Sequence, residues 1–151
     1  MSVIRLTTAN LEHFSRRIAT LKSDSPRKWG SMSPAKMLAH LRLTLELSCG
    51  DRPVPDNSSW FSRKIYKYLV YHVFPWPKGR IKVPDQFSPE PEFSFDEERT
   101  KMLAAAQRFA ETSAKEPTRS TVHFMFGPMT LEYWQHVHGR HFDHHLKQFG
   151  A

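Results

Sequence analysis

Histidines are concentrated near the end of the chain, with a spacing that suits metal binding. Five of the nine histidines fall within ten residues: His136, His138, His141, His144 and His145. No proline interrupts this stretch, and a helix places residues three, four and seven apart on one face. His138, His141 and His145 then form one stripe, with His144 beside it and His136 pointing elsewhere. Imidazoles four residues apart can share an ion of the zinc type at about 2.0–2.1 Å.

Two histidines need a third ligand from elsewhere in the chain, and His40 can supply it. His40 lies on the apolar face of an earlier predicted helix. Three neutral imidazoles leave a coordination position open, as in catalytic zinc sites, and the uncompensated ion would acidify a bound water or thiol. Spacing alone leaves two alternatives open. His40 is a core histidine with a single hydrogen-bond partner, or the histidine-rich stretch is only a surface helix.

Three polar neighbours complete the predicted site. His138 or His144 can act as a fourth ligand, a hydrogen-bond donor to a ligand, or a proton shuttle. Gln148 lies one turn after His145 and can bond a ring nitrogen or a bound water. We therefore predict catalytic roles for His138, His144 and Gln148. Asp143 falls on the far side of the helix and receives no role.

Four amphipathic segments predict an all-α fold. They are residues Thr8–Leu21, Pro34–Cys49, Ser94–Ala114 and the stretch from Thr130 to the end. Ser33, Ser94 and Thr130 are suitable helix caps, because their hydroxyls accept from the first free backbone N–H groups. No segment makes a convincing strand. The pattern favours a four-helix bundle, in which ligand sites form in the core from facing helices.

A proline-rich region separates the second and third of these helices. Residues 53–91 hold most of the eleven prolines, and within them residues 60–73 predict a short helix in which aromatic and basic residues alternate. One interpretation is an interfacial or lid segment; the other is a helix that packs on one side and extends its lysines to solvent. Pro75–Gly79 predicts a turn, and Ile81–Pro91 a loop.

Length, charge and cysteine content narrow the class of protein. The 151 residues suit one domain, spanning residues 1–151. The formal net charge of +7 permits nucleic-acid or membrane binding, but no nucleic-acid reading motif is present, and no stretch approaches the roughly 20 apolar residues of a membrane span. One cysteine and the lack of a signal peptide favour a soluble, cytoplasmic protein.

Several motifs resemble the DinB-like (DinB/YfiT-type) superfamily. Trp29-Gly30 followed by Met32–Leu41 resembles its second-helix signature, and His141–Gly150 its final-helix signature. Pro75–Gly79 and His123–Thr130 resemble one branch, catalogued as a domain of unknown function. The resemblance implies a four-helix bundle, often dimeric. It also implies a divalent metal ion, often nickel or zinc, which by position would be held by His40, His141 and His145.

The resemblance also suggests a reaction. Some members of the superfamily are thiol transferases or thiol-dependent isomerases that use a metal ion, so a metal-dependent thiol S-transferase or hydrolase is expected, with a small-molecule substrate such as a low-molecular-weight thiol. The alternative is a non-catalytic, stress-linked binding module in which the metal is structural or absent. A third hypothesis is an anionic-surface binder that uses residues 60–82.

Overall fold

A computed structural model describes residues 4–76, 78, 86, 90–92 and 94–151. The chain is mostly helical and has one small two-stranded sheet. In chain order the elements are η1 (Thr8–Asn10), α1 (Leu11–Ala19), α2 (Pro34–Cys49), η2 (Ser62–Tyr66), η3 (Leu69–Val73), α3 (Phe95–Lys115), β1 (Ser120–His123), β2 (Gly127–Thr130) and α4 (Leu131–Gln148). Within the described part, every helix is too short or too polar to cross a membrane.

The longer helices begin where the sequence places their caps. Ser33 accepts a hydrogen bond from the Lys36 backbone N–H, and Thr130 accepts one from that of Tyr133. Ser94 forms a reciprocal capping box with Glu97. Helix α2 ends at Gly50, whose φ of 88° is the left-handed conformation that glycine adopts at little cost. These local signals fix the phase of α2 and α4, and so fix which side chains face each other.

The first helix differs from its prediction. A short 3₁₀ turn, η1, precedes α1, and neither Thr7 nor Asn10 caps the element that follows it with its side chain. Helix α1 buries Phe14 and Ile18, which lie four residues apart on one face of the helix. The helix is thus held by packing rather than by a cap.

The expectation of no strands was wrong. β1 and β2 form an antiparallel hairpin in which Ser120 pairs with Thr130 and His123 with Gly127. Gly127 has a φ of 69°, which a larger side chain would adopt only with strain. The strands have four residues each and carry little alternation of polar and apolar residues, so periodicity gives almost no signal for them.

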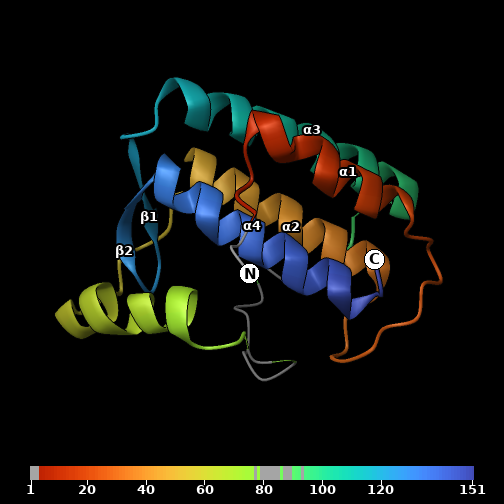
Figure 1. The fold of residues 1–151 in the computed structure, drawn as a ribbon, viewed down its shortest axis with the longest axis horizontal. Helices are drawn as coiled ribbons and strands as arrows, with labels where there is room; N and C mark the ends of the chain where they lie inside the picture. Colours follow the sequence, from red (N-terminus) through yellow and green to blue (C-terminus); the bar gives the residue numbers. More distant parts are fainter. Residues whose placement is uncertain (1–3, 77, 79–85, 87–89, 93) are drawn as a thin grey trace.

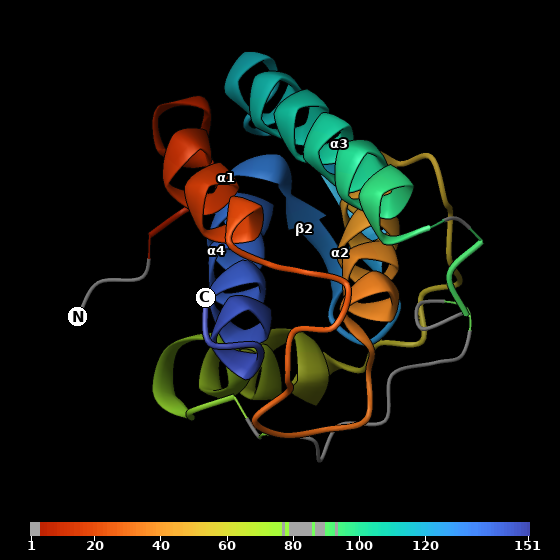
Figure 2. The same ribbon diagram turned by 90° about the vertical axis from the view of Figure 1, so that its right-hand side faces the viewer.

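The four longer helices pack on one another around a shared core. Figures 1 and 2 show α2 and α4 side by side, with α1 and α3 on one side of them. Residues 60–73 form continuous helical turns, partly π-helical, and cross below α2 and α4 on the opposite side (yellow-green in Figure 2). Of the predicted turn at 75–79 the structure describes residues 75, 76 and 78, and most of the predicted loop at 81–91 lies outside the described residues.

Residues 60–73 are joined to the hairpin. The Asn57 backbone N–H donates to the Phe124 carbonyl, and the rings of Tyr66 and Tyr71 lie 5.8 and 5.3 Å from that of Phe126. These contacts hold the segment against one end of the space between α2 and α4. His40, His141 and His145 lie in that space.

Candidate metal centre

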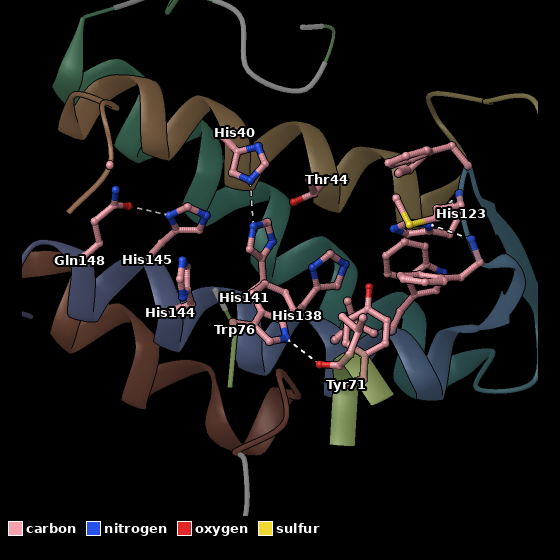
Figure 3. Close-up of a pocket in the computed structure, with 18 of the residues that line it drawn as sticks. His40, Thr44, Tyr71, Trp76, His123, His138, His141, His144, His145 and Gln148 are labelled. Carbon is pink, nitrogen blue, oxygen red and sulfur yellow. Dashed lines mark hydrogen bonds between the residues drawn. The ribbon is translucent and has the colours of Figure 1, made fainter. Parts of the chain in front are cut away.

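Three buried histidines from two helices converge between α2 and α4. His40 comes from α2, and His141 and His145 come from successive turns of α4 (Figure 3). Each side chain is buried, and one ring nitrogen from each lies within 4.8 Å of the other two. The Nε2 atoms of His40 and His141 are 2.8 Å apart. At that distance one nitrogen donates a proton to the other, or both direct lone pairs toward a shared cation.

This histidine triad (His40, His141 and His145) fits a divalent ion. Nitrogens that share an ion tetrahedrally at 2.0–2.1 Å stand about 3.4 Å apart. The observed spacings, from 2.8 Å between His40 and His141 up to 4.8 Å, lie on both sides of that value, so side-chain rotations can bring the three nitrogens to it. Imidazole is a preferred ligand for zinc, nickel and copper. The triad can hold such an ion without rearrangement of either helix.

Gln148 orients one member of the triad. Its Nε2 donates to the Trp29 carbonyl at 2.8 Å, so its Oε1 is free to accept from His145 Nδ1–H at 2.9 Å. This arrangement fixes the tautomer of His145 and leaves its Nε2 lone pair toward the triad. Such outer hydrogen bonds commonly tune metal ligands. Gly30 makes the contact possible, because a Cβ there would lie 2.7 Å from Gln148 Nε2.

Helix α4 is fixed to its neighbours at several points. The Lys28 N–H donates to the Gln148 carbonyl at 2.7 Å, and Arg17 on α1 pairs with Asp143 at 3.0 Å. In mid-helix, Gly139 lets the chain near Ile4 approach closely, since a Cβ at Gly139 would lie 1.9 Å from the Ile4 carbonyl oxygen. The glycine that interrupts the histidine pattern thus serves packing, and the helix continues through it.

His138 and His144 lie near the triad in different settings. His138 is fully buried, and its Nε2 is 2.8 Å from Ser48 Oγ, which itself donates to the Leu45 carbonyl. His138 Nε2 therefore carries the proton, and its Nδ1 is a buried acceptor with no partner among the described residues. The His144 ring lies 5.1 Å from that of His145, and the described residues offer its nitrogens no hydrogen bond. Both ring nitrogens of His144 are therefore available for hydrogen bonds within this part of the chain, whereas His138 uses its Nε2 to bond Ser48.

The triad opens into a cavity of about 310 Å³. Besides the predicted residues, the cavity wall includes several that the sequence did not single out: Thr44, Tyr71, Trp76 and His123. His123 Nδ1 accepts from the backbone N–H groups of Met125 and Phe126, which leaves the proton on Nε2. In the sequence His123 is a lone histidine just before an aromatic turn. Its position in the cavity wall depends on the hairpin, which the sequence did not reveal.

Burial keeps these histidines uncharged. It is the main cause that holds the pKa values of His141 and His145 well below the usual value, followed by the nearby His40 ring. Burial also lowers the pKa of His123 to about 4 and that of His138 to about 3. Neutral imidazoles have the lone pairs that a metal ion requires.

The remaining residues of the histidine-rich stretch face elsewhere. His136 Nε2 lies 3.2 Å from the Tyr71 carbonyl oxygen, and its ring stacks on that of His72 at 4.8 Å. Asp143 pairs with Arg17 and Lys147 on the outer side of α4. Helical spacing predicts that His136 and Asp143 lie off the stripe formed by His138, His141 and His145, and their positions agree with it.

Three comparisons relate the chain to known proteins. Searches of curated proteins and of solved structures found no match. The profile of one family covers nearly the whole chain, residues 2–151. The chain therefore belongs to the family described as protein of unknown function (DUF1569).

Proposed function

We propose that the protein is a metal-dependent enzyme of the DinB/YfiT type, in which His40, His141 and His145 hold a nickel or zinc ion. The observation that carries the proposal is the convergence of three buried imidazoles at the wall of a small-molecule-sized cavity. In this proposal α1 to α4 form the superfamily's four-helix bundle, residues 53–91 are its proline-rich insertion, and the functional unit is a homodimer.

The proposed reaction is thiol S-transfer or hydrolysis. A bound divalent ion supplies Lewis acidity, lowering the pKa of a coordinated thiol or water. Gln148 keeps the His145 ring in position. His144 accepts the proton that the nucleophile releases, because its nitrogens have no protein partner in the described part of the chain. Burial lowers the pKa of His144, in part opposed by Asp143, so it is a neutral base at physiological pH.

His138 has a different role in this scheme. Its Nε2–H is held by Ser48, and the rings of Trp134 and Phe109 lie 5.3 and 4.7 Å from it. Burial lowers the pKa of His138 to about 3, so at neutral pH it is a poor proton acceptor. We assign it to shaping the cavity wall beside the triad, and we assign proton transfer to His144.

Metal loading tests the ligand set. The full-length chain and the variants His40→Ala and His141→Ala would be stripped with EDTA, dialysed separately against zinc and nickel, and assayed by elemental analysis. We expect about one ion per wild-type chain and at least tenfold less in both variants. His13→Ala, a histidine of α1 outside the cavity, is the matched control and should retain the ion. Full metal content in His40→Ala would remove that residue from the site.

Turnover separates catalysis from a structural metal. Metal-loaded protein would be given a small thiol with an aryl halide electrophile, and in parallel an activated ester. We expect turnover of one of the two that His144→Ala reduces while leaving the metal content unchanged. If EDTA lowers the melting temperature strongly but neither substrate is turned over by the loaded protein, the metal is structural and the enzymatic proposal fails.

A further inference from the structure

The cavity extends well beyond the triad. The α4 residues that line it run from Trp134 to Gln148, about 21 Å along the helix at a rise of 1.5 Å per residue. The triad occupies the C-terminal part. The remainder lies against the hairpin and residues 66–71, and we call it the aromatic chamber: Leu47, Tyr71, His123, Phe126, Val137 and His138.

Rings form a continuous wall in this chamber. Ring centroids are 5.3 Å apart between Tyr71 and Phe126, 4.7 Å between Phe126 and His123, and 5.5 Å between His123 and Trp134. The rings of Trp134 and His138 stack at 5.3 Å. The wall is built from the hairpin, η3 and α4, which meet only in the folded chain. Walls of this kind favour flat, apolar ligands.

The wall carries no formal charge. Among the described residues that line the cavity there is no aspartate, glutamate, lysine or arginine, although the chain has a net charge of +7. Cations lie near the wall without forming part of it. Arg140 donates to the Tyr71 and Phe74 carbonyls, Lys67 lies 5.2 Å from the Tyr133 ring centroid, and Lys78 lies 4.7 Å from that of Trp29 at the triad end. A charged group in the chamber would lose its hydration with no charged side chain in the wall to pair with it, which is unfavourable.

The chamber nevertheless offers uncharged hydrogen-bonding groups. His123 has an Nε2–H, and Tyr71 a hydroxyl, for which the described residues provide no partner. Burial raises the pKa of the Tyr71 hydroxyl, so it stays protonated. His138 Nδ1 is a buried acceptor that no described residue satisfies. A ligand group that can both donate and accept, such as a hydroxyl, would complement this set.

We propose that the aromatic chamber binds the body of the substrate, and that this body is uncharged, ring-shaped and bears a hydroxyl group, while the reacting end of the molecule lies at the histidine triad. The placement of the reacting end rests on the proposed function. The preference of the chamber does not, because it can be measured without metal. The cavity volume of about 310 Å³ limits the body to one or two rings. A thiol that carries several carboxylates does not suit the chamber, so the electrophile or ester is the molecule that occupies it.

Calorimetric titration of EDTA-treated, full-length protein tests the preference. The probes are naphthalenemethanol, methylnaphthalene and naphthoate, which share one ring system and differ in the group attached to it. We expect the alcohol to bind at least about tenfold more tightly than the anion, with the hydrocarbon between them. Equal or tighter binding of naphthoate, or no binding of any probe, would overturn the proposal.

Two variants locate the binding in the chamber. Val137→Phe fills it and should weaken binding of the alcohol at least tenfold, whereas the matched change Val73→Phe, at an exposed position outside the cavity, should not. If Val137→Phe does not fold by circular dichroism, Tyr71→Phe decides. It should reduce the advantage of the alcohol over methylnaphthalene about threefold or more, while Tyr68→Phe on the exposed side leaves it intact. Unchanged binding in the folded chamber variants would contradict the assignment.

The two proposals can fail separately. If the chain binds no metal but the stripped protein prefers the uncharged alcohol, the metal enzyme is wrong and the chamber assignment stands. If metal loading succeeds and the chamber variants leave probe binding unchanged, the triad remains and the substrate class is wrong.

Discussion

Helix α2 carries two buried polar residues that belong to regions of opposite character. Arg42 faces α3, where its Nε and Nη2 reach the two carboxylate oxygens of Glu98 at 3.0 and 3.2 Å and its Nη1 reaches Glu46 at 3.0 Å. His40, half a turn away, faces α4 and the other members of the triad. Both regions are buried between helices. One pairs each charge with an opposite charge, and the other gathers bases that have no acid among them.

The difference shows which region is built for structure and which for binding. A buried arginine beside two carboxylates has its donors satisfied, and nothing in that network calls for a further ligand. Imidazoles in their neutral form offer lone pairs that a cation can share. Pairing with an opposite charge stabilises the helix pair, whereas a group of bases without an acid among them suits a site for a cation.

Removing the carboxylate of Glu98 should have the largest effect. The Glu98 side chain is 0% exposed and that of Arg42 is 11% exposed, so Glu98→Gln leaves a buried charge with a weakened partner. We expect the free energy of unfolding to fall by about 3–5 kcal/mol, measured by urea denaturation. Metal content per folded chain should not change, because the network lies on the other side of α2.

The control for this variant is Glu111→Gln, at an exposed position of the same helix, which should alter stability by less than about 0.5 kcal/mol. Replacing both partners, as in Arg42→Met with Glu98→Leu, should recover most of the loss, since no unpaired charge remains. A loss of metal in Glu98→Gln at unchanged folding would show that the two regions are coupled.

Weakening the support of His145 should have a smaller effect, confined to the other region. Gln148→Ala removes the acceptor at His145 Nδ1 and the bond to the Trp29 carbonyl. We expect metal affinity to fall about 10–100-fold, measured by competition with a chromophoric chelator. Gln107→Ala, a glutamine on the exposed side of α3, is the matched control. If Gln148→Ala binds metal as tightly as wild type, the orienting role of this side chain is wrong.

Sequence spacing placed His141 and His145 on one helix face, and the family resemblance added His40; the structure brings the three rings together. Local signals fix the two helices that carry them. Proline after Ser33 sets the start of α2, Thr130 sets that of α4, and three- and four-residue steps then determine which histidines face inward. The buried network was not readable in this way. Glu98 follows two other acids in the first turn of α3, a pattern typical of a helix start, yet it is fully buried. Helical periodicity shows which face of a helix a residue occupies, but it does not show which residues of another helix lie opposite.

The aromatic chamber was beyond the reach of the sequence for a related reason. Tyr71 and His123 become neighbours of α4 only because residues 60–73 cross under the helices and the hairpin turns His123 inward. Short strands and π-helical turns carry weak periodic signals. The three converging histidines lie on two helices whose phase the sequence indicates, whereas the walls of the cavity depend on contacts between distant segments.

Lowering the pH should reduce the free energy of unfolding through the buried histidines, with a still smaller effect for each group. The pKa of His123 is about 4 in the folded chain and about 6.5 when unfolded. Between these values the unfolded chain binds more protons, so stability is full above pH 6.5 and is lost as the pH falls toward 4. The slope is about 1.4 kcal/mol per pH unit for one group. Urea denaturation in EDTA at pH 7, 6 and 5 should show this loss, with His138 adding to it in the same direction.

A conservative variant isolates the share of His123. His123→Asn keeps an acceptor for the Met125 and Phe126 N–H groups but does not titrate in this range. The slope of its free energy of unfolding against pH should therefore be smaller than that of wild type by about the contribution of one proton. An unchanged slope in His123→Asn would mean that this imidazole is not held neutral by the fold. The donor at Nε2–H and the uncharged character of the chamber would then lose their support, whereas the contrast between the two faces of α2 would remain.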